Sequence, residues 1–147
     1  MDNQEAFYAE EFALYTSQSF FLTGKAGTGK TTLLKKILTQ TDKNVVVVAP
    51  TGVAAINAGG VTIHSMFGLP LTSFIPNNDF VDLNIANNRS SLKKHMRFRK
   101  EKRKLLQELD LLIIDEISMV RADLLDAIDF ILQEVRHNRE PFGGLQV

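Results

Sequence analysis

Continuous runs of apolar residues along the chain predict buried strands. Residues 45–49 and 111–114 consist of Val, Ala, Leu and Ile, which is typical of strands covered on both faces in a parallel sheet. Residues 19–23 form a shorter run with two phenylalanines and also predict a strand. Because a helical pattern at 32–40 separates two of these runs, the sequence predicts a βαβ unit.

Apolar residues at helical spacing predict the longer helices. The pattern is present at residues 4–15, 32–40, 92–108 and 124–135, where apolar side chains share one face. The last of these helices has a row of acids opposite its apolar face, which we interpret as a solvated surface. Those acids are Asp123, Asp126, Asp129 and Glu134.

The middle of the chain is less regular. Thr51 is placed to cap a short helix that ends at the Gly59–Gly60 pair, and residues 61–67 are a short mixed stretch. Residues 68–91 contain two prolines and five asparagines without a visible period. A long stretch of this kind is typical of a functional insertion or a loop, so we predict no regular elements there.

The segment after the first predicted strand has the pattern of a phosphate-binding loop. Residues 24–31 match G-x-x-x-x-G-K-[ST] at every fixed position, between a predicted strand and a predicted helix. Backbone N–H groups and Lys30 would contact a triphosphate, and the Thr31 hydroxyl is a candidate Mg²⁺ ligand. The predicted ATP-binding residues are Gly24, Ala26, Gly27, Thr28, Gly29, Lys30, Thr31 and Thr32.

Two carboxylates follow the predicted strand at 111–114. Ligands of open α/β sheets bind at the carboxyl ends of the strands, where Asp115 and Glu116 stand. We predict that Asp115 holds Mg²⁺ and that Glu116 is the general base in ATP hydrolysis. An unrelated metal site or a helix cap would use the same pair of residues. The guanine-recognising Asn-Lys-x-Asp pattern is absent, which favours ATP.

Composition narrows the class of protein. At 147 residues the chain predicts one domain, and no apolar run is long enough for a membrane span. The sequence shows no secretory signal, so we expect a cytoplasmic protein without membrane association. There is no cysteine, which excludes disulfides and thiolate metal sites.

Charge is unevenly distributed, although the formal net charge is zero. Residues 93–104, called the basic segment below, hold eight Lys or Arg and one acid, whereas the remaining chain holds nine basic and sixteen acidic residues. The basic segment is either a solvated face or a surface that follows a DNA backbone, with Phe98 stacked on a base. The solvated face is the simpler interpretation.

Three blocks of sequence together resemble one family. Residues 24–31, 49–67 and 113–120 are similar to the phosphate loop, the motif Ia region and the Mg²⁺-binding motif of RecD-like, Pif-family DNA helicases of superfamily 1. The resemblance covers about residues 19–67 and 109–147. It implies a three-layer, RecA-like P-loop NTPase fold with a mostly parallel sheet. It also implies ATP-driven 5′→3′ translocation on single-stranded DNA and duplex unwinding.

The resemblance assigns roles to particular residues. Lys30 would act on the phosphates as a catalytic residue, Thr31 and Asp115 would hold Mg²⁺, and Glu116 would be the catalytic base. A lone histidine is more often structural, but His64 falls in the implied DNA-binding region. The implied DNA-binding residues are Thr51, Gly52, Thr62, His64 and Ser65.

The chain departs from the family pattern at two places. The family has an adenine-recognising glutamine just before the first strand, where this chain has Phe7, with Gln4 further upstream. Gln4 is a candidate for that role, although a solvated terminal glutamine is the simpler interpretation. The family pattern also continues beyond Val147 with a further strand and a second RecA-like domain. Residues 1–147 are therefore expected to be the N-terminal part of a first motor domain.

The resemblance also implies an order of strands in the sheet and a requirement for a second domain. In related sheets the strand that begins at Leu145 lies between the phosphate-loop strand and the strand before Asp115. The second RecA-like domain would be required for activity.

The rivals to a helicase are an AAA-type ATPase that acts on protein, and a truncated module that binds nucleotide or DNA without turnover.

Overall fold

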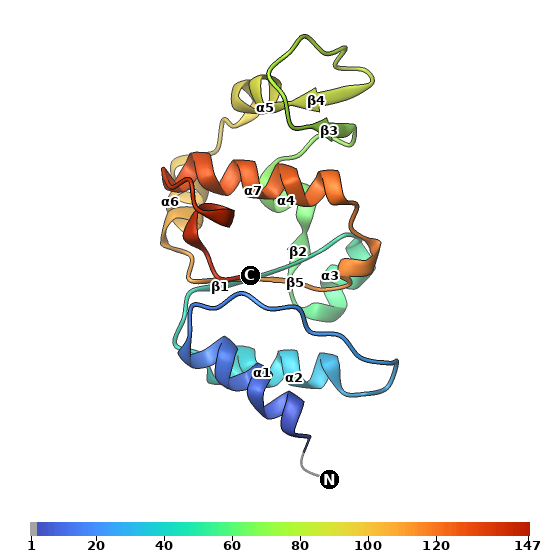
Figure 1. Cartoon of the computed structure of the whole chain (residues 1–147), viewed down its shortest axis with the longest axis vertical. Helices are drawn as coiled ribbons and strands as arrows, with labels where there is room; N and C mark the ends of the chain where they lie inside the picture. The colour runs from blue at the N-terminus through green and yellow to red at the C-terminus, as the bar shows by residue number, and fades with distance from the viewer. Residues whose placement is uncertain (1–2) are drawn as a thin grey trace.

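A small parallel sheet separates two layers of helices in the computed structural model, which describes residues 3–147 (Figure 1). The strand order is β2 (Val61–Thr62), β1 (Val45–Ala49) and β5 (Leu111–Ile114), all parallel. Val45 lies opposite Leu111, and Val48 lies opposite Ile114. The α/β fold with a parallel sheet is thus confirmed.

The two faces of the sheet are covered by different helices. Val47 and Ile113 pack with Leu34 and Ala58, which come from α2 (Lys30–Gln40) and α3 (Gly52–Ala58). On the other face lie α4 (Ile63–Phe67), α6 (Lys100–Glu108) and α7 (Ala122–Arg136), which share the main core with Val48 and Leu112. Because successive strand residues point to opposite faces, the uninterrupted apolar runs serve both layers.

The remaining elements are short or peripheral. Helix α1 (Gln4–Tyr15) packs on α2, and Asn3 caps it by accepting the Ala6 N–H. Two 3₁₀ turns, Ile117–Met119 and Pro141–Gly144, flank α7. Within residues 3–147, none of the helices is both long and apolar enough to cross a membrane.

The predicted strand at residues 19–23 is wrong. The segment lies beside the C-terminal residues, where the Phe20 N–H donates to the Val147 carbonyl (3.1 Å) and the Val147 N–H donates to Ser19 Oγ (2.9 Å). One backbone bond does not make the ladder that defines a strand. The apolar character of residues 19–23 alone was therefore not enough to predict a strand.

Residues 145–147 lie between β5 and residues 19–20, as the related sheets led us to expect. Leu111 and Gln146 form a parallel bridge, and the Leu112 N–H donates to the Gln146 carbonyl (2.9 Å). On the other side, Val147 accepts from Phe20. The order of these segments is thus confirmed.

Residues 68–91 contain regular structure, contrary to the prediction. Strands β3 (Ser73–Ile75) and β4 (Ala86–Asn88) pair in parallel at one end of the molecule (Figure 1). Buried asparagines hold them: Asn87 donates to the Thr72 hydroxyl, and Asn88 donates to the Asp79 carbonyl (2.5 Å). Three-residue strands stabilised by side-chain amides leave no apolar period for a sequence pattern to detect.

The single helix predicted at 92–108 is also wrong. The structure has α5 (Arg89–His95) and α6, separated by residues 96–99. Met96 and Phe98 both pack against the main core. Side chains two residues apart do not share a face of a helix, so a continuous helix could not direct both of these half-buried side chains into the core.

Candidate functional site

The phosphate loop is a tight turn that surrounds the Lys30 amine. Lys30 Nζ donates to the carbonyls of Gly24 (2.5 Å) and Lys25 (2.9 Å). Gly27 and Gly29 have φ values of 77° and 87°, in the left-handed region that glycine adopts without steric cost. Thr28 Oγ1 closes the turn by donating to the Lys25 carbonyl (2.8 Å). This geometry fits the role that the sequence pattern assigns to the loop.

The loop leads directly into α2, which begins at Lys30. Gly29 is the N-cap residue and supplies no side-chain hydrogen bond to the first turn. The N–H groups there stay available to an anion, and the helix dipole favours a negative charge at that end. The Thr31 and Thr32 side chains are exposed beside it, as is Ala26. The donor set therefore suits a phosphate chain.

The two predicted carboxylates lie at the carboxyl edge of the sheet. The Asp115 N–H donates to the Val48 carbonyl of β1 (2.9 Å), and the Glu116 N–H donates to Asp115 Oδ1 (3.0 Å). Figure 1 shows the loop that precedes α2 on the same side of the view, the right, as the ends of β1 and β5. Both sequence motifs therefore lie towards the same side of the molecule in this view.

Glu116 has an unusual backbone conformation. Its φ of 54° and ψ of 43° lie in the left-handed region, and its side chain is exposed. A non-glycine residue there costs of order 1–2 kcal/mol. Since Glu116 directly precedes a 3₁₀ turn, this conformation sets the direction in which its carboxylate leaves the strand end.

A pocket of about 720 Å³ lies between α1 and the start of α2. Gln4 and Phe7 line it from α1, and Gly29 and Thr32 line it from the phosphate loop and α2. The sequence left Gln4 upstream of the position where the family has its glutamine. Residues i and i+3 of a helix share a face, so Gln4 and Phe7 both border the pocket.

The candidate DNA-binding residues gather at the carboxyl ends of β1 and β2, where Ala49 pairs with Thr62. Thr51 Oγ1 accepts the Ala54 N–H (3.2 Å) and so caps α3. Thr62 Oγ1 accepts the Ser65 N–H (3.2 Å) and caps α4. Gly52 and Ser65 are exposed and His64 is half-buried. Both threonine hydroxyls shape these turns in addition to any role toward a ligand.

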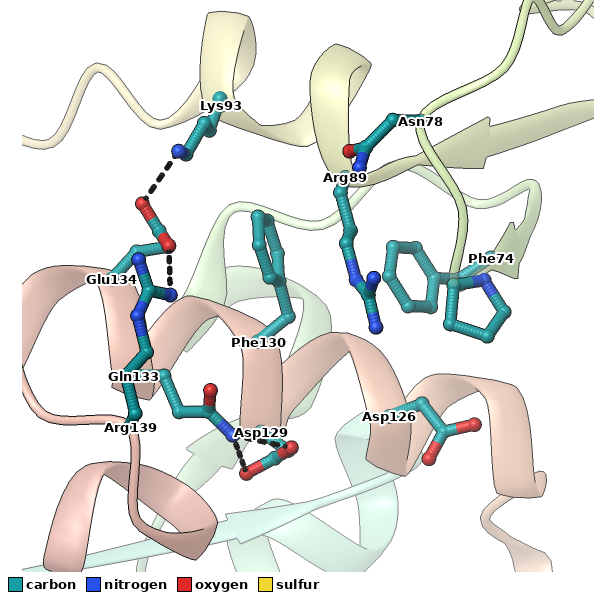
Figure 2. Close-up of a pocket in the computed structure, with 11 residues that line it drawn as sticks. Phe74, Asn78, Arg89, Lys93, Asp126, Asp129, Phe130, Gln133, Glu134 and Arg139 are labelled. Atoms are coloured by element: carbon teal, nitrogen blue, oxygen red, sulfur yellow. Dashed lines mark hydrogen bonds and ion pairs between the residues drawn. The ribbon is translucent and has the colours of Figure 1, made fainter.

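The acids of α7 are not the solvated face that the sequence suggested. Figure 2 shows Glu134 between Lys93 (3.0 Å) and Arg139 (2.5 Å), at a pocket of about 370 Å³. Asp129 accepts from Gln133 and from the Phe142 N–H (2.6 Å). Only Asp126 of the four is exposed. None of the predicted site residues lines this pocket.

A further α7 acid holds β3 in place. Asp123 accepts the Phe74 N–H (2.9 Å), and Arg121 bonds both Asp123 (2.8 Å) and Ser73 (2.8 Å). Burial alone would raise the pKa of Asp123, but these hydrogen bonds outweigh it and the pKa lies below its ordinary value of 3.8. In Glu134, burial likewise opposes the effect of Lys93 and Arg139, and its pKa lies below 4.5. Both acids are therefore ionised, and their hydrogen bonds and ion pairs attach neighbouring segments to α7.

Residues 2–147 match the family model described as PIF1-like helicase. The chain is 40% identical over 134 residues to the ATP-dependent DNA helicase PIF1 of Saccharomyces cerevisiae, covering 88% of this chain and 14% of the relative. It is 44% identical to Bacteroides Pif1 bound to single-stranded DNA, with a TM-score of 0.81, covering 100% of this chain and 31% of that one. A Bacteroides Pif1 complex with ADP-AlF4 matches at 44% identity and a TM-score of 0.80, with the same coverage of 100% and 31%.

Proposed function

Since the chain belongs to the PIF1-like helicase family, we propose that it binds Mg·ATP at the phosphate loop as part of an ATP-dependent DNA helicase. The observation that carries this proposal is the phosphate loop closed around Lys30, with Asp115 and Glu116 following β5 at the carboxyl edge of the sheet. The chain spans 14% of the yeast relative and 31% of the Bacteroides one, so helicase activity is proposed for the whole protein and not for these residues alone.

Nucleotide binding rests on residues already close together. On binding, Lys30 Nζ exchanges the Gly24 and Lys25 carbonyls for the β- and γ-phosphate oxygens. The N–H groups of the loop and of the first turn of α2 donate to the same phosphates. Thr31 and Asp115 are the residues that would hold Mg²⁺, which neutralises charge on the phosphates. Oxygen ligands of this kind fit Mg²⁺.

Hydrolysis requires a base near the γ-phosphate, and Glu116 fits that role. The Glu116 side chain is exposed at the strand end, while its N–H fixes Asp115 Oδ1. Its carboxylate would orient the attacking water and accept its proton. A second RecA-like domain, as the family resemblance implies, would complete the site in the longer protein.

The base of the nucleotide would lie in the pocket between α1 and α2. Gln4 offers an amide that can both donate to and accept from an adenine edge, and Phe7 offers an aromatic face. The Gln4 amide also donates to the Tyr8 hydroxyl (3.0 Å), which orders its side chain. The preference for adenine rests on the absence of the guanine-recognising Asn-Lys-x-Asp pattern.

Single-stranded DNA would bind along the edge formed by Thr51, Gly52, Thr62, His64 and Ser65. The support is the solved Bacteroides Pif1 relative that is bound to single-stranded DNA. Translocation with 5′→3′ polarity, duplex unwinding and a cytoplasmic location complete the proposal. The relatives that match are DNA helicases, which supports this function over an AAA-type ATPase acting on protein.

The test is DNA-stimulated ATP hydrolysis by the longer protein, with ATP binding measured on this chain. We expect Mg·ATP binding by the chain and phosphate release that rises when single-stranded DNA is added. Hydrolysis that DNA leaves unchanged would contradict the helicase proposal. Binding of nucleotide and DNA without any turnover by the longer protein would instead favour the non-catalytic module.

A further inference from the structure

The basic segment contains two groups of cations that differ in their contacts. Lys93 pairs with Glu134 (3.0 Å), Lys104 pairs with Glu108 (3.8 Å), and Arg103 reaches the Met96 carbonyl (3.5 Å). The other group is exposed and, within residues 3–147, forms no ion pair or side-chain hydrogen bond. It comprises Lys94, Arg97, Arg99 and Lys100.

These four cations lie on a short stretch, residues 94–100, that the fold fixes firmly. Met96 and Phe98 anchor it from within, since both pack against the main core. The Phe98 ring lies against Gly68, where an added Cβ would approach its Cε1 to 3.4 Å. Phe98 is therefore a half-buried anchor of this stretch. Stacking of its ring on a DNA base stays a prediction. Arg97 and Arg99, which alternate with these two apolar residues, are exposed to solvent.

The same stretch is tied to the candidate DNA-binding edge. Lys102 Nζ donates to the Ser65 carbonyl (2.9 Å) in α4, one residue after His64. Gly68, which contacts Phe98, is the residue that ends α4. The free cations and the Thr62–Ser65 turn therefore belong to one rigid part of the molecule.

We propose that residues 94–100 form a second phosphate-binding surface, which extends the path of single-stranded DNA beyond the α3–α4 edge. The inference rests on the proposed DNA-binding function and adds residues that the family motifs do not include. Its partner is the sugar–phosphate backbone, because four cations without aromatic partners supply charge and no base recognition. Contact is therefore independent of DNA sequence.

A solvated face accounts less well for the same observations. Elsewhere on the chain some exposed cations pair with acids, as Lys36 does with Glu10 (2.6 Å) and Arg139 with Glu134 (2.5 Å). Isolated exposed cations such as Lys35 and Arg89 form no ion pair in the described chain either, but residues 94–100 bring four such cations together. Glu101 is the one acid within the basic segment, and it makes no ion pair in the described chain. Unbalanced like charges held close together repel each other, so their local concentration favours an anionic partner.

The experiment compares two double variants of this chain that remove the same charge. Arg97→Gln/Lys100→Gln alters the proposed surface, and Lys35→Gln/Arg89→Gln removes two exposed cations outside residues 94–100. Affinity for a labelled oligothymidine strand is measured by fluorescence anisotropy at several salt concentrations, and far-UV circular dichroism checks each fold. Each lost contact to single-stranded DNA lowers the log–log salt slope by about 0.7. We expect a slope shallower by about 1.4 for the first variant.

The outcomes separate this inference from the proposed function. A shallower slope for Arg97→Gln/Lys100→Gln than for the control variant supports the second surface. Equal slopes for the two variants, with DNA still bound, overturn it and leave DNA binding to the α3–α4 edge. Absence of DNA binding by the unaltered chain overturns the DNA-binding proposal as well. Tighter binding of an oligouridine strand than of oligothymidine would overturn DNA as the partner.

Discussion

Lys43 Nζ lies 2.6 Å from Gln146 Oε1, although 103 positions separate the two residues in the sequence. Lys43 Nζ also donates to the carbonyls of Ala13 (2.7 Å) and Thr16 (2.5 Å). The Gln146 amide in turn donates to Phe12 (2.9 Å) and Gln18 (2.8 Å). This pair joins the end of α1 and the segment leading to the phosphate loop to the edge of the sheet.

Gln146→Ala is expected to destabilise the fold. The Gln146 side chain is 2% exposed, and its loss leaves the half-buried carbonyls of Phe12 and Gln18 and the Lys43 amine short of partners. We expect a loss of about 2–3 kcal/mol in the free energy of unfolding, measured by urea titration. Gln40→Ala, at an exposed position, should change it by less than about 0.5 kcal/mol. Equal effects of the two variants would show that the pair contributes nothing.

Lys30→Ala is expected to abolish nucleotide binding. Lys30 is the fixed charge at the centre of the loop, and its removal leaves the β- and γ-phosphates without that cation. Isothermal titration calorimetry with Mg·ATP measures the effect, with Lys35→Ala in the same helix as the matched control. Unchanged affinity of Lys30→Ala would mean that Lys30 is not the phosphate lysine.

Glu116→Gln in the longer protein should keep ATP affinity and lose turnover. A glutamine keeps the shape of the side chain but does not accept the proton of water, so the rate should fall by about 10²-fold or more. Steady-state phosphate release in the presence of single-stranded DNA is the measurement, and Glu140→Gln is the control. Turnover within about twofold of the unaltered protein would place the base elsewhere.

Gln4→Ala is expected to weaken base discrimination rather than phosphate binding. Loss of a hydrogen bond to adenine corresponds to about 1 kcal/mol, or about fivefold in affinity for Mg·ATP. Binding of inorganic triphosphate, which has no base, should not change. Calorimetry with ATP, CTP and triphosphate separates these terms. If the ratio of ATP to CTP affinity is the same in both proteins, Gln4 does not contact the base.

Acid should loosen the attachment of α5 to α7. The pKa of Glu134 is lowered in the folded state, so its contribution to stability is present above its ordinary value of 4.5 and is lost as pH falls through the lower, folded pKa. Glu134→Gln should cost about 1 kcal/mol at pH 7, and the difference should shrink towards pH 3. Urea midpoints between these two pH values measure it. A constant difference would contradict the ion-pair origin.

The sequence predicted those parts of the fold that depend on local pattern. The runs at 45–49 and 111–114 became strands because their side chains pack on both faces of the sheet, as Val47 and Ile113 do on one face and Val48 and Leu112 on the other. The loop at 24–31 was recognisable because its chemistry requires fixed residue types at fixed spacing. Asp115 and Glu116 followed from the position of the second run.

The parts that failed depend on contacts distant in sequence. Residues 19–23 were predicted as a strand from composition. Strand formation depends on backbone hydrogen bonds to a neighbouring segment, and Val147 supplies one such bond, to Phe20. The break at 96–99 comes from Met96 and Phe98 reaching a core made by other elements. The α7 acids were assigned to solvent, although Lys93 and Phe74 approach them from a separate segment. A local sequence pattern holds no information about such long-range contacts.

The left-handed backbone conformation of Glu116 affects how this protein could be stabilised by mutation. A search for stabilising substitutions would select glycine or asparagine at this position, because both relieve the unfavourable φ of 54°. Each would remove the carboxylate whose direction that conformation sets. On the proposed role of Glu116, thermal stability and turnover compete at this one residue, and a screen for thermal stability alone would select variants that have lost turnover.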